Sequence, residues 1–171
     1  MSKYRKILLG DPAPLFRQRS TGGRFFDTST ASGRFYVLCF FVTASDAPGK
    51  AALDAIRDNW RLYDEAELSF IGISLDPEDE CKVRGVQLPA IRYIWDFDGT
   101  VSRLFGAVPL DSMPGDGDYL ARRFWLLLDP ARVMVALVPF AGDGSEQSEL
   151  FAALDALPSL SLPKVARGTF T

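Results

Sequence analysis

The feature that most constrains the fold is the continuous apolar run over residues 35–42. The run consists of aromatic residues, valine, leucine and one cysteine, and this is the pattern of a strand that is covered on both faces. It is too short to span a bilayer, which takes about 20 apolar residues. It therefore predicts a central strand of a sheet that has other elements packed on both sides.

A helix and a second apolar run follow this strand. After a polar break at residues 43–49, apolar residues recur at helical spacing from residue 50 to residue 63. Either Ser45 or Asp46 is suited to cap this helix, and Pro48 is tolerated in its first turn. Residues 68–75 then resemble a second buried strand. This order predicts a parallel β-α-β unit.

The remaining elements are shorter. We expect strands at residues 24–27, 91–95, 124–128 and 133–138, and helices at residues 78–83, 101–105 and 145–157. A β-α-β start followed by an antiparallel strand pair and a terminal helix predicts an α/β, thioredoxin-like fold with a central mixed β-sheet flanked by helices. We expect one domain over residues 1–160 and a flexible C-terminal tail over residues 161–171.

The absence of histidine excludes more function classes than any other single observation. It removes most zinc and non-haem iron sites, and every catalytic pair of a serine or cysteine with a histidine. The net charge of −3 gives no basic surface for nucleic acid or for an anionic membrane. No secretory signal is recognisable, so we expect a cytoplasmic protein that uses no metal and no cofactor.

Four segments, in order along the chain, resemble the motifs of one family. Their sequences are GDPAPLF at residues 10–16, GRFYVLCFF at 33–41, FIGISLD at 70–76 and RFWLLLDP at 123–130. They are similar to the G-D-x-A-P-x-F, G-K-x-V-V-L-F-F-Y, V-x-G-I-S-x-D and R-x-T-F-I-I-D-P segments of the peroxiredoxin (alkyl hydroperoxide reductase/thiol-specific antioxidant) family. The match covers about residues 8–160. It implies a thioredoxin fold and an antioxidant oxidoreductase that reduces peroxides with a reactive cysteine.

The loop after the first strand departs from the family pattern P-x-x-x-T-x-x-C. In register with it, Val42 stands for the proline, Asp46 for the threonine and Gly49 for the peroxidatic cysteine. That cysteine attacks peroxide as a thiolate, which a helix N-terminus and a nearby arginine stabilise. Arg123 resembles this arginine, but glycine carries no nucleophile, and the carboxylate of Asp46 opposes thiolate formation. We therefore predict a degenerate active site that is not catalytic as a peroxidase.

The two cysteines of the chain leave one alternative open. Cys39 lies inside the apolar run, where a cysteine is normally an inert small apolar residue. Cys81 lies in a polar stretch and is expected to be exposed. Acidic residues precede it and Lys82 and Arg84 follow it, so the charges near its thiol oppose one another and leave its reactivity open. Cys81 is therefore either a surface cysteine without a role or the candidate thiol of a thiol-dependent antioxidant oxidoreductase that reduces peroxide.

Residues 96–100, Asp-Phe-Asp-Gly-Thr, resemble the D-x-D-G-T signature of haloacid-dehalogenase-type phosphatases. In that family the first aspartate is the nucleophile and a magnesium ion is bound. The family also needs a lysine ahead of a later acidic pair, and the only lysine after Thr100 is Lys164. We therefore interpret the segment as a turn that precedes a helix.

A narrower resemblance indicates partners. Residues 88–99 and the Leu-Pro pair at 157–158 are similar to the redoxin domain found ahead of some iron(II)/2-oxoglutarate oxygenase domains. Those oxygenases bind iron through histidines, so this chain does not contain that module. We expect a homodimer, or a protein partner such as an oxygenase domain, and neither nucleic acid nor membrane. We also expect Trp60, Trp95 and Trp125 in the core, and acidic residues 78–80 in solvent.

Overall fold

The computed structural model describes residues 3–21, 24–31, 33–64, 66–83, 90–112, 121–141, 143 and 145–156. Within these residues, five strands form one sheet in the order β5-β4-β3-β6-β7, and β1 and β2 form a separate antiparallel ribbon. The strands are β1 (Arg17–Arg19), β2 (Phe25–Asp27), β3 (Phe35–Val42), β4 (Leu68–Ser74), β5 (Ile91–Trp95), β6 (Phe124–Leu128) and β7 (Met134–Pro139). The α-helices are α1 (Ala47–Asp58), α2 (Asp79–Val83), α3 (Thr100–Leu104) and α4 (Ser145–Asp155), and short 3-10 turns lie at Thr28–Thr30 and Trp60–Leu62.

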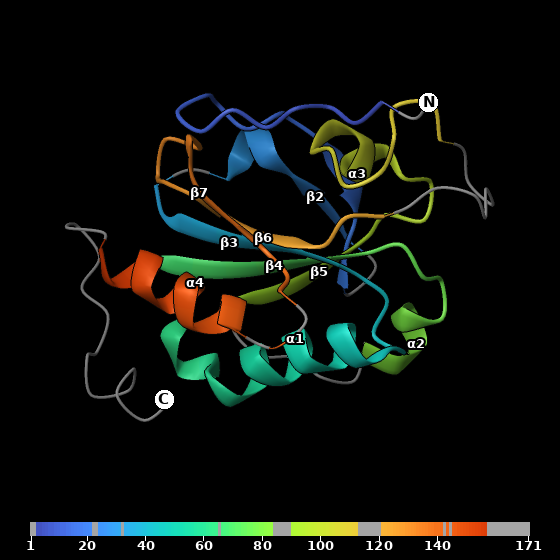
Figure 1. Ribbon diagram of the computed structural model, residues 1–171. Helices are drawn as coiled ribbons and strands as arrows, with labels where there is room; N and C mark the ends of the chain where they lie inside the picture. The colour runs from blue at the N-terminus through green and yellow to red at the C-terminus, as the bar shows by residue number, and fades with distance from the viewer. Residues whose placement is uncertain are drawn as a thin grey trace.

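The sheet is the middle layer of the molecule. Figure 1 shows α1 and α4 on one of its faces, with α3 and the β1-β2 ribbon on the other. Strand β3 pairs in parallel with β4 and antiparallel with β6, so the sheet is mixed. This confirms the predicted α/β class with a central mixed sheet between helices.

Strand β3 lies in the middle of the sheet, and both of its faces are buried. Val37 and Cys39 pack into the core under α1 and α4, whereas Leu38 and Phe40 pack into a second core under α3 and the β1-β2 ribbon. All four side chains are at most 1% exposed. Burying each large apolar side chain of this kind contributes about 1.5–3 kcal/mol. Because successive side chains of β3 enter the two cores in turn, both sets of positions are apolar, and this explains the unbroken apolar run in the sequence.

Helix α1 begins and ends at side-chain caps. Asp46, one of the two cap candidates that the sequence left open, is its N-cap, and Pro48 lies in its first turn as predicted. The helix ends earlier than predicted, because the Asn59 side-chain amide donates a 2.6 Å hydrogen bond to the Ala55 carbonyl and a 3-10 turn follows. In that turn Trp60 is 40% exposed, so its prediction as a core residue is wrong.

Two sequence expectations concern the C-terminal tail and membranes. The predicted tail at residues 161–171 lies outside the described residues. As for membranes, no helix among the described residues combines the length and the apolar content that a crossing requires.

Candidate functional site

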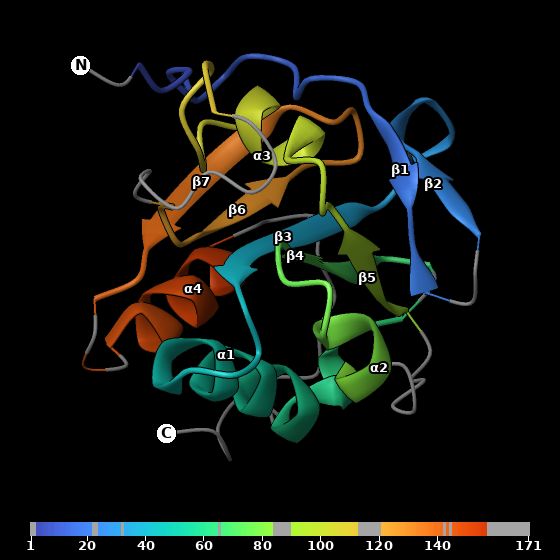
Figure 2. The same ribbon diagram turned by 90° about the vertical axis from the view of Figure 1, so that its right-hand side faces the viewer.

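The chain turns sharply at the end of β3. Val42 has a φ of 71°, a left-handed conformation that a β-branched residue rarely adopts. The Thr43 amide donates a 2.8 Å hydrogen bond to the Phe41 carbonyl across this residue, so the turn is a γ-turn with positive φ. Figure 2 shows the connection that runs from here to the start of α1.

Two carboxylates hold this connection in place. The Thr43 hydroxyl donates to Asp76 at 2.7 Å, and the Ala44 amide donates to Asp79 at 2.9 Å. Asp79 is fully buried and also accepts a 2.6 Å hydrogen bond from the Ser74 hydroxyl. Residues from the end of β4 and the start of α2 thus fix the loop between β3 and α1.

The loop leaves no room for a side chain at Gly49. A Cβ atom added there would lie 1.7 Å from the Thr43 carbonyl oxygen and 2.9 Å from its carbon. Real Cβ atoms do not approach within 3.0 Å of backbone atoms, so this loop conformation requires glycine at position 49.

A carboxylate of the same loop occupies the N-terminus of α1. The Gly49 amide donates a 3.0 Å hydrogen bond to the Asp46 Oδ1. The Arg123 guanidinium, just before β6, binds both oxygens of Asp46, with Nη1 3.0 Å from Oδ1 and Nη2 bonded to Oδ2. Partial burial raises the pKa of Asp46, but the hydrogen bonds from Arg123 and Gly49 outweigh it and leave that pKa below its ordinary value. The carboxylate is therefore the anion that both the helix N-terminus and the arginine stabilise.

The Asp-Phe-Asp-Gly-Thr segment is a helix cap. The buried Asp96 carboxylate accepts hydrogen bonds from the amides of Val101, at 2.9 Å, and Ser102, at 2.7 Å. The Gln18 amide donates to the same carboxylate at 3.0 Å. Both oxygens are thus engaged in starting α3, and the interpretation as a turn before a helix is confirmed. The pKa of Asp96 is raised because of its burial, although these hydrogen bonds lower it in part.

Comparison with known proteins decides the family. Residues 9–136 match the AhpC/TSA family. The chain belongs to the AhpC/TSA family. This confirms the resemblance to peroxiredoxins that the four sequence segments indicated.

Solved structures of peroxiredoxins share the fold of this AhpC/TSA chain at low sequence identity. A yeast mitochondrial 1-Cys peroxiredoxin has a TM-score of 0.71 at 18% identity, over 88% of this chain and 76% of that one. Peroxidoxin BcpB from Mycobacterium tuberculosis has a TM-score of 0.69 at 23% identity, over 88% of this chain and 98% of that one. Mycobacterium tuberculosis AhpC has a TM-score of 0.68 at 19% identity, over 90% of this chain and 94% of that one. A search of curated proteins found no match.

The AhpC/TSA fold brings together four of the predicted site residues. Val42 forms the turn, Asp46 and Arg123 form the ion pair, and Gly49 lies under the Thr43 carbonyl. That Gly49 stands for the peroxidatic cysteine stays a prediction. Sequence reasoning missed the contribution of Asp79, which lies in an acidic stretch and was expected in solvent.

The two thiols lie in contrasting surroundings. Cys39 is fully buried in β3, and this burial raises the pKa of its thiol well above the ordinary value. Cys81 is exposed on α2, two residues after Asp79. Among the described residues, no group of three or more histidine, cysteine, aspartate or glutamate side chains is arranged to hold a metal ion.

Proposed function

We propose that this AhpC/TSA domain retains the peroxiredoxin fold without the thiol peroxidase reaction at the β3–α1 loop, and that it acts as a binding domain. The observation that carries the proposal is the Asp46 carboxylate, which is bound at once to the Gly49 amide and to Arg123. A peroxiredoxin needs a thiolate at this kind of place, where a helix N-terminus and an arginine lower the pKa of the thiol. Here those two groups already stabilise a carboxylate.

Electrostatics supports the same proposal. Two like charges about 4 Å apart near a protein surface repel each other by about 4 kcal/mol. A thiolate introduced beside the Asp46 carboxylate would therefore lose much of the stabilisation that Arg123 offers. The close contact between the Thr43 carbonyl and Gly49 adds a steric reason, since a cysteine side chain there requires the loop to move.

The partner in this proposal is argued from the sequence alone. Because residues 88–99 resemble the redoxin domain that precedes some iron(II)/2-oxoglutarate oxygenases, we propose as partner either an oxygenase chain or a second copy of this domain. A cytoplasmic location belongs to the same proposal. Sedimentation velocity over a concentration series tests the second copy: a concentration-dependent dimer supports it, and a monomer at every concentration rules it out.

A second candidate function follows from the exposure of Cys81. In this alternative, the Cys81 thiolate attacks one oxygen of a peroxide, which releases water or an alcohol and leaves a sulfenic acid that a dithiol reduces. Cys81 lies two residues after Asp79, and Asp79 holds the β3–α1 loop through its bond with Ala44. The thiol therefore lies in the same region of the fold as that loop.

A peroxide consumption assay separates the two. The wild type, Cys81→Ser and Cys39→Ser are each incubated with hydrogen peroxide and dithiothreitol, and consumption is compared with dithiothreitol alone. We expect no protein-dependent turnover in any of them. Turnover that Cys81→Ser abolishes and Cys39→Ser keeps overturns the non-catalytic proposal in favour of Cys81. Turnover that survives Cys81→Ser contradicts both candidates.

A further inference from the structure

The β1-β2 ribbon brings positive charge together on an otherwise acidic chain. Residues 12–45, which include the ribbon, contain four arginines and one acidic residue, although the whole chain has a net charge of −3. Three exposed arginines lie on the ribbon or next to it: Arg17, Arg19 and Arg24. A fourth exposed arginine, Arg92, lies on the neighbouring strand β5. The ribbon therefore offers a positively charged surface to a partner.

Most of these charges have no counterpart within the described part of the chain. Arg19 forms a 2.6 Å ion pair with Glu80. No ion pair among the described residues involves the other three arginines, which are Arg17, Arg24 and Arg92. The acidic residue of the ribbon, Asp27, accepts hydrogen bonds from the Ser29 amide at 2.9 Å and from the Ser29 hydroxyl at 2.7 Å. Guanidinium groups therefore remain for carboxylates of another molecule.

An exposed aromatic ring lies among these charges. Phe25 on β2 is 52% exposed. The Arg17 Cζ lies 4.1 Å from the centroid of this ring, so the guanidinium of a β1 residue stacks on a side chain of β2. Figure 2 shows β2 as the outer strand of the ribbon, at the side of the molecule. The charge of Arg17 is thus held over the outer strand.

The outer edge of β2 carries free backbone groups. The bonded pairs of the ribbon are marked by the Ser20 amide on the Arg24 carbonyl, at 2.6 Å, and the Thr28 amide on the Phe16 carbonyl, at 3.0 Å. Bonded and non-bonded pairs alternate in an antiparallel ribbon, so Phe25 and Asp27 occupy non-bonded positions. Their amides, and the Phe25 carbonyl, point away from β1, while the Asp27 carbonyl accepts from the Thr30 hydroxyl at 2.7 Å. Among the described residues no strand pairs with this edge.

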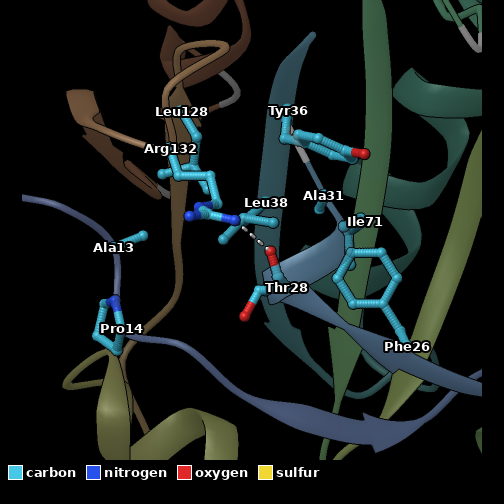
Figure 3. Close-up of a pocket in the computed structure, with 10 residues that line it drawn as sticks. All are labelled: Ala13, Pro14, Phe26, Thr28, Ala31, Tyr36, Leu38, Ile71, Leu128 and Arg132. Atoms are coloured by element: carbon cyan, nitrogen blue, oxygen red, sulfur yellow. Dashed lines mark hydrogen bonds between the residues drawn. The ribbon is translucent and has the colours of Figure 1, made fainter. Parts of the chain in front are cut away.

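The inner side of the ribbon is anchored on the sheet. The Phe26 ring packs edge-on against the Tyr36 ring of β3, with the two centroids 6.4 Å apart. Figure 3 shows Arg132 reaching from the turn between β6 and β7 to Thr28, where its Nη1 donates to the carbonyl at 3.0 Å. The ribbon is therefore ordered before a partner binds, and this reduces the entropy lost on binding.

The edge, the ring and the charges together are complementary to an extended acidic peptide. The backbone of such a peptide pairs with the free groups of β2, as in strand addition to the edge of a sheet. Its carboxylates gain charge-assisted hydrogen bonds from the arginines, and its other side chains cover Phe25. A nucleic acid or an anionic lipid surface also meets the charges, but it leaves the backbone edge unpaired.

We propose that an extended acidic segment of a partner protein binds the ribbon as a third strand beside β2, with a carboxylate on Arg17. The proposal names the chemistry of the partner in the binding function proposed above, and it rests on that function. The two can fail separately, because peroxide consumption tests the β3–α1 loop and peptide binding tests the ribbon.

The test uses a decapeptide of alternating glutamate and threonine as the probe, and one of alternating glutamine and threonine as its uncharged match. Each is titrated into the full chain, and the amide resonances of the protein are followed by NMR. We expect saturable shifts at Phe25 and Asp27 with the acidic peptide, and at least about fivefold weaker binding of the uncharged one. Arg17→Gln should weaken binding of the acidic peptide about fivefold, whereas Arg57→Gln, on α1 at the other face of the sheet, should leave it unchanged.

Two substitutions at one position isolate the backbone edge. Phe25→Ala and Phe25→Pro both remove the ring, but only proline also removes the outward amide, and neither breaks a bond between β1 and β2. We expect Phe25→Pro to bind the acidic peptide at least about fivefold more weakly than Phe25→Ala, which corresponds to the loss of one hydrogen bond. The spectrum itself reports whether each variant is folded.

Several results would overturn the proposal. They are a wild type without saturable shifts, an uncharged peptide that binds as tightly as the acidic one, a folded Arg17→Gln that binds like the wild type, and a folded Phe25→Pro that binds like Phe25→Ala. Tighter binding of decauridylate, or of phosphatidylserine vesicles, at the same residues would overturn it in favour of a nucleic acid or a membrane.

Discussion

At the scale of single residues, the Thr43 carbonyl decides what can stand at position 49. It occupies the place that a Cβ atom of residue 49 would take, and it is held there through the bonds of Thr43 to Asp76 and of Ala44 to Asp79. A backbone carbonyl cannot swing aside as the end of a long side chain can. The steric conflict therefore has to be relieved by moving the whole loop.

The first prediction concerns Gly49→Cys. We expect this change to lower the free energy of unfolding by about 1–3 kcal/mol or more, the usual cost of overpacking, and to give no peroxide turnover. Denaturant unfolding measures the first effect and the peroxide assay the second. Ala51→Cys, on an exposed position of the same helix, is the matched control and should be close to wild type. A Gly49→Cys variant that is as stable as this control would contradict the geometry described for the loop.

The second prediction concerns the charge on Asp46. Its pKa is lowered in the folded protein, because Arg123 and Gly49 outweigh the effect of partial burial. A lowered pKa contributes stability that is present above the unfolded-state pKa of about 4 and is lost as the pH falls through the folded-state pKa. Asp46→Asn should therefore be less stable than wild type at pH 7, by about 1 kcal/mol, and the difference should shrink in acid. Urea unfolding at pH 7 and at pH 3 measures this, and a difference that does not depend on pH would refute it.

At the scale of elements, α3 depends on one buried carboxylate. Asp96 starts this short helix by accepting from two of its amides and also binds Gln18 on β1, so it ties the ribbon to the sheet. A five-residue helix has little stability of its own, since nucleation is costly and few bonds repay it. Loss of the cap should therefore be felt in the unfolding of the whole domain.

The third prediction follows from this cap. In Asp96→Asn, one of the two oxygens becomes an NH₂ group that cannot accept the bond that the Ser102 or Val101 amide now donates. We expect the free energy of unfolding to fall by about 1–3 kcal/mol, the cost of an unsatisfied buried donor. Asp98→Asn changes an exposed member of the same turn and should cost much less. Equal effects of the two substitutions, measured by denaturant titration, would show that burial of Asp96 is not what matters.

Most elements were predictable because periodicity and caps are local properties. Neighbouring residues alone indicate the apolar runs of β3 and β4, a cap of α1 at Ser45 or Asp46, and the turn before α3. Trp60 was wrongly placed in the core, since the helical spacing continues to residue 63, past Asn59, where the side-chain bond to the Ala55 carbonyl closes the helix. Asp79 was wrongly placed in solvent, since its partner Ala44 lies 35 positions away along the chain.

The sequence indicated which residues belong to the candidate site, but not how they are arranged. The family pattern named Val42, Asp46, Gly49 and Arg123, but the ion pair joins residues 77 positions apart, and no spacing rule gives such a contact. The blocking carbonyl of Thr43 is a backbone atom, which a sequence pattern does not represent at all. Tertiary contacts of this kind are what the sequence alone left out.

At the scale of the whole molecule, the two cores on either side of the sheet determine how the thiols respond to reagents. Cys39 lies on β3, in the core between the sheet and the helices α1 and α4, and it is 0% exposed. Reaching it requires the helices to leave the sheet, which is close to global unfolding. Cys81 is exposed in the folded state.

The last prediction is therefore a two-phase reaction with Ellman's reagent. One thiol per chain should react at once, and the second should react more than about a thousandfold more slowly, because a domain of ordinary stability opens globally with a free energy of about 5–15 kcal/mol. The slow rate should rise with urea as steeply as the unfolding constant does, since the same surface is exposed in both processes. Cys81→Ser should lose the fast phase alone, and Cys39→Ser the slow phase alone. A slow phase that does not respond to urea would mean that β3 is reached by a local opening at the β3–α1 loop, and the two cores would then not act as one cooperative unit.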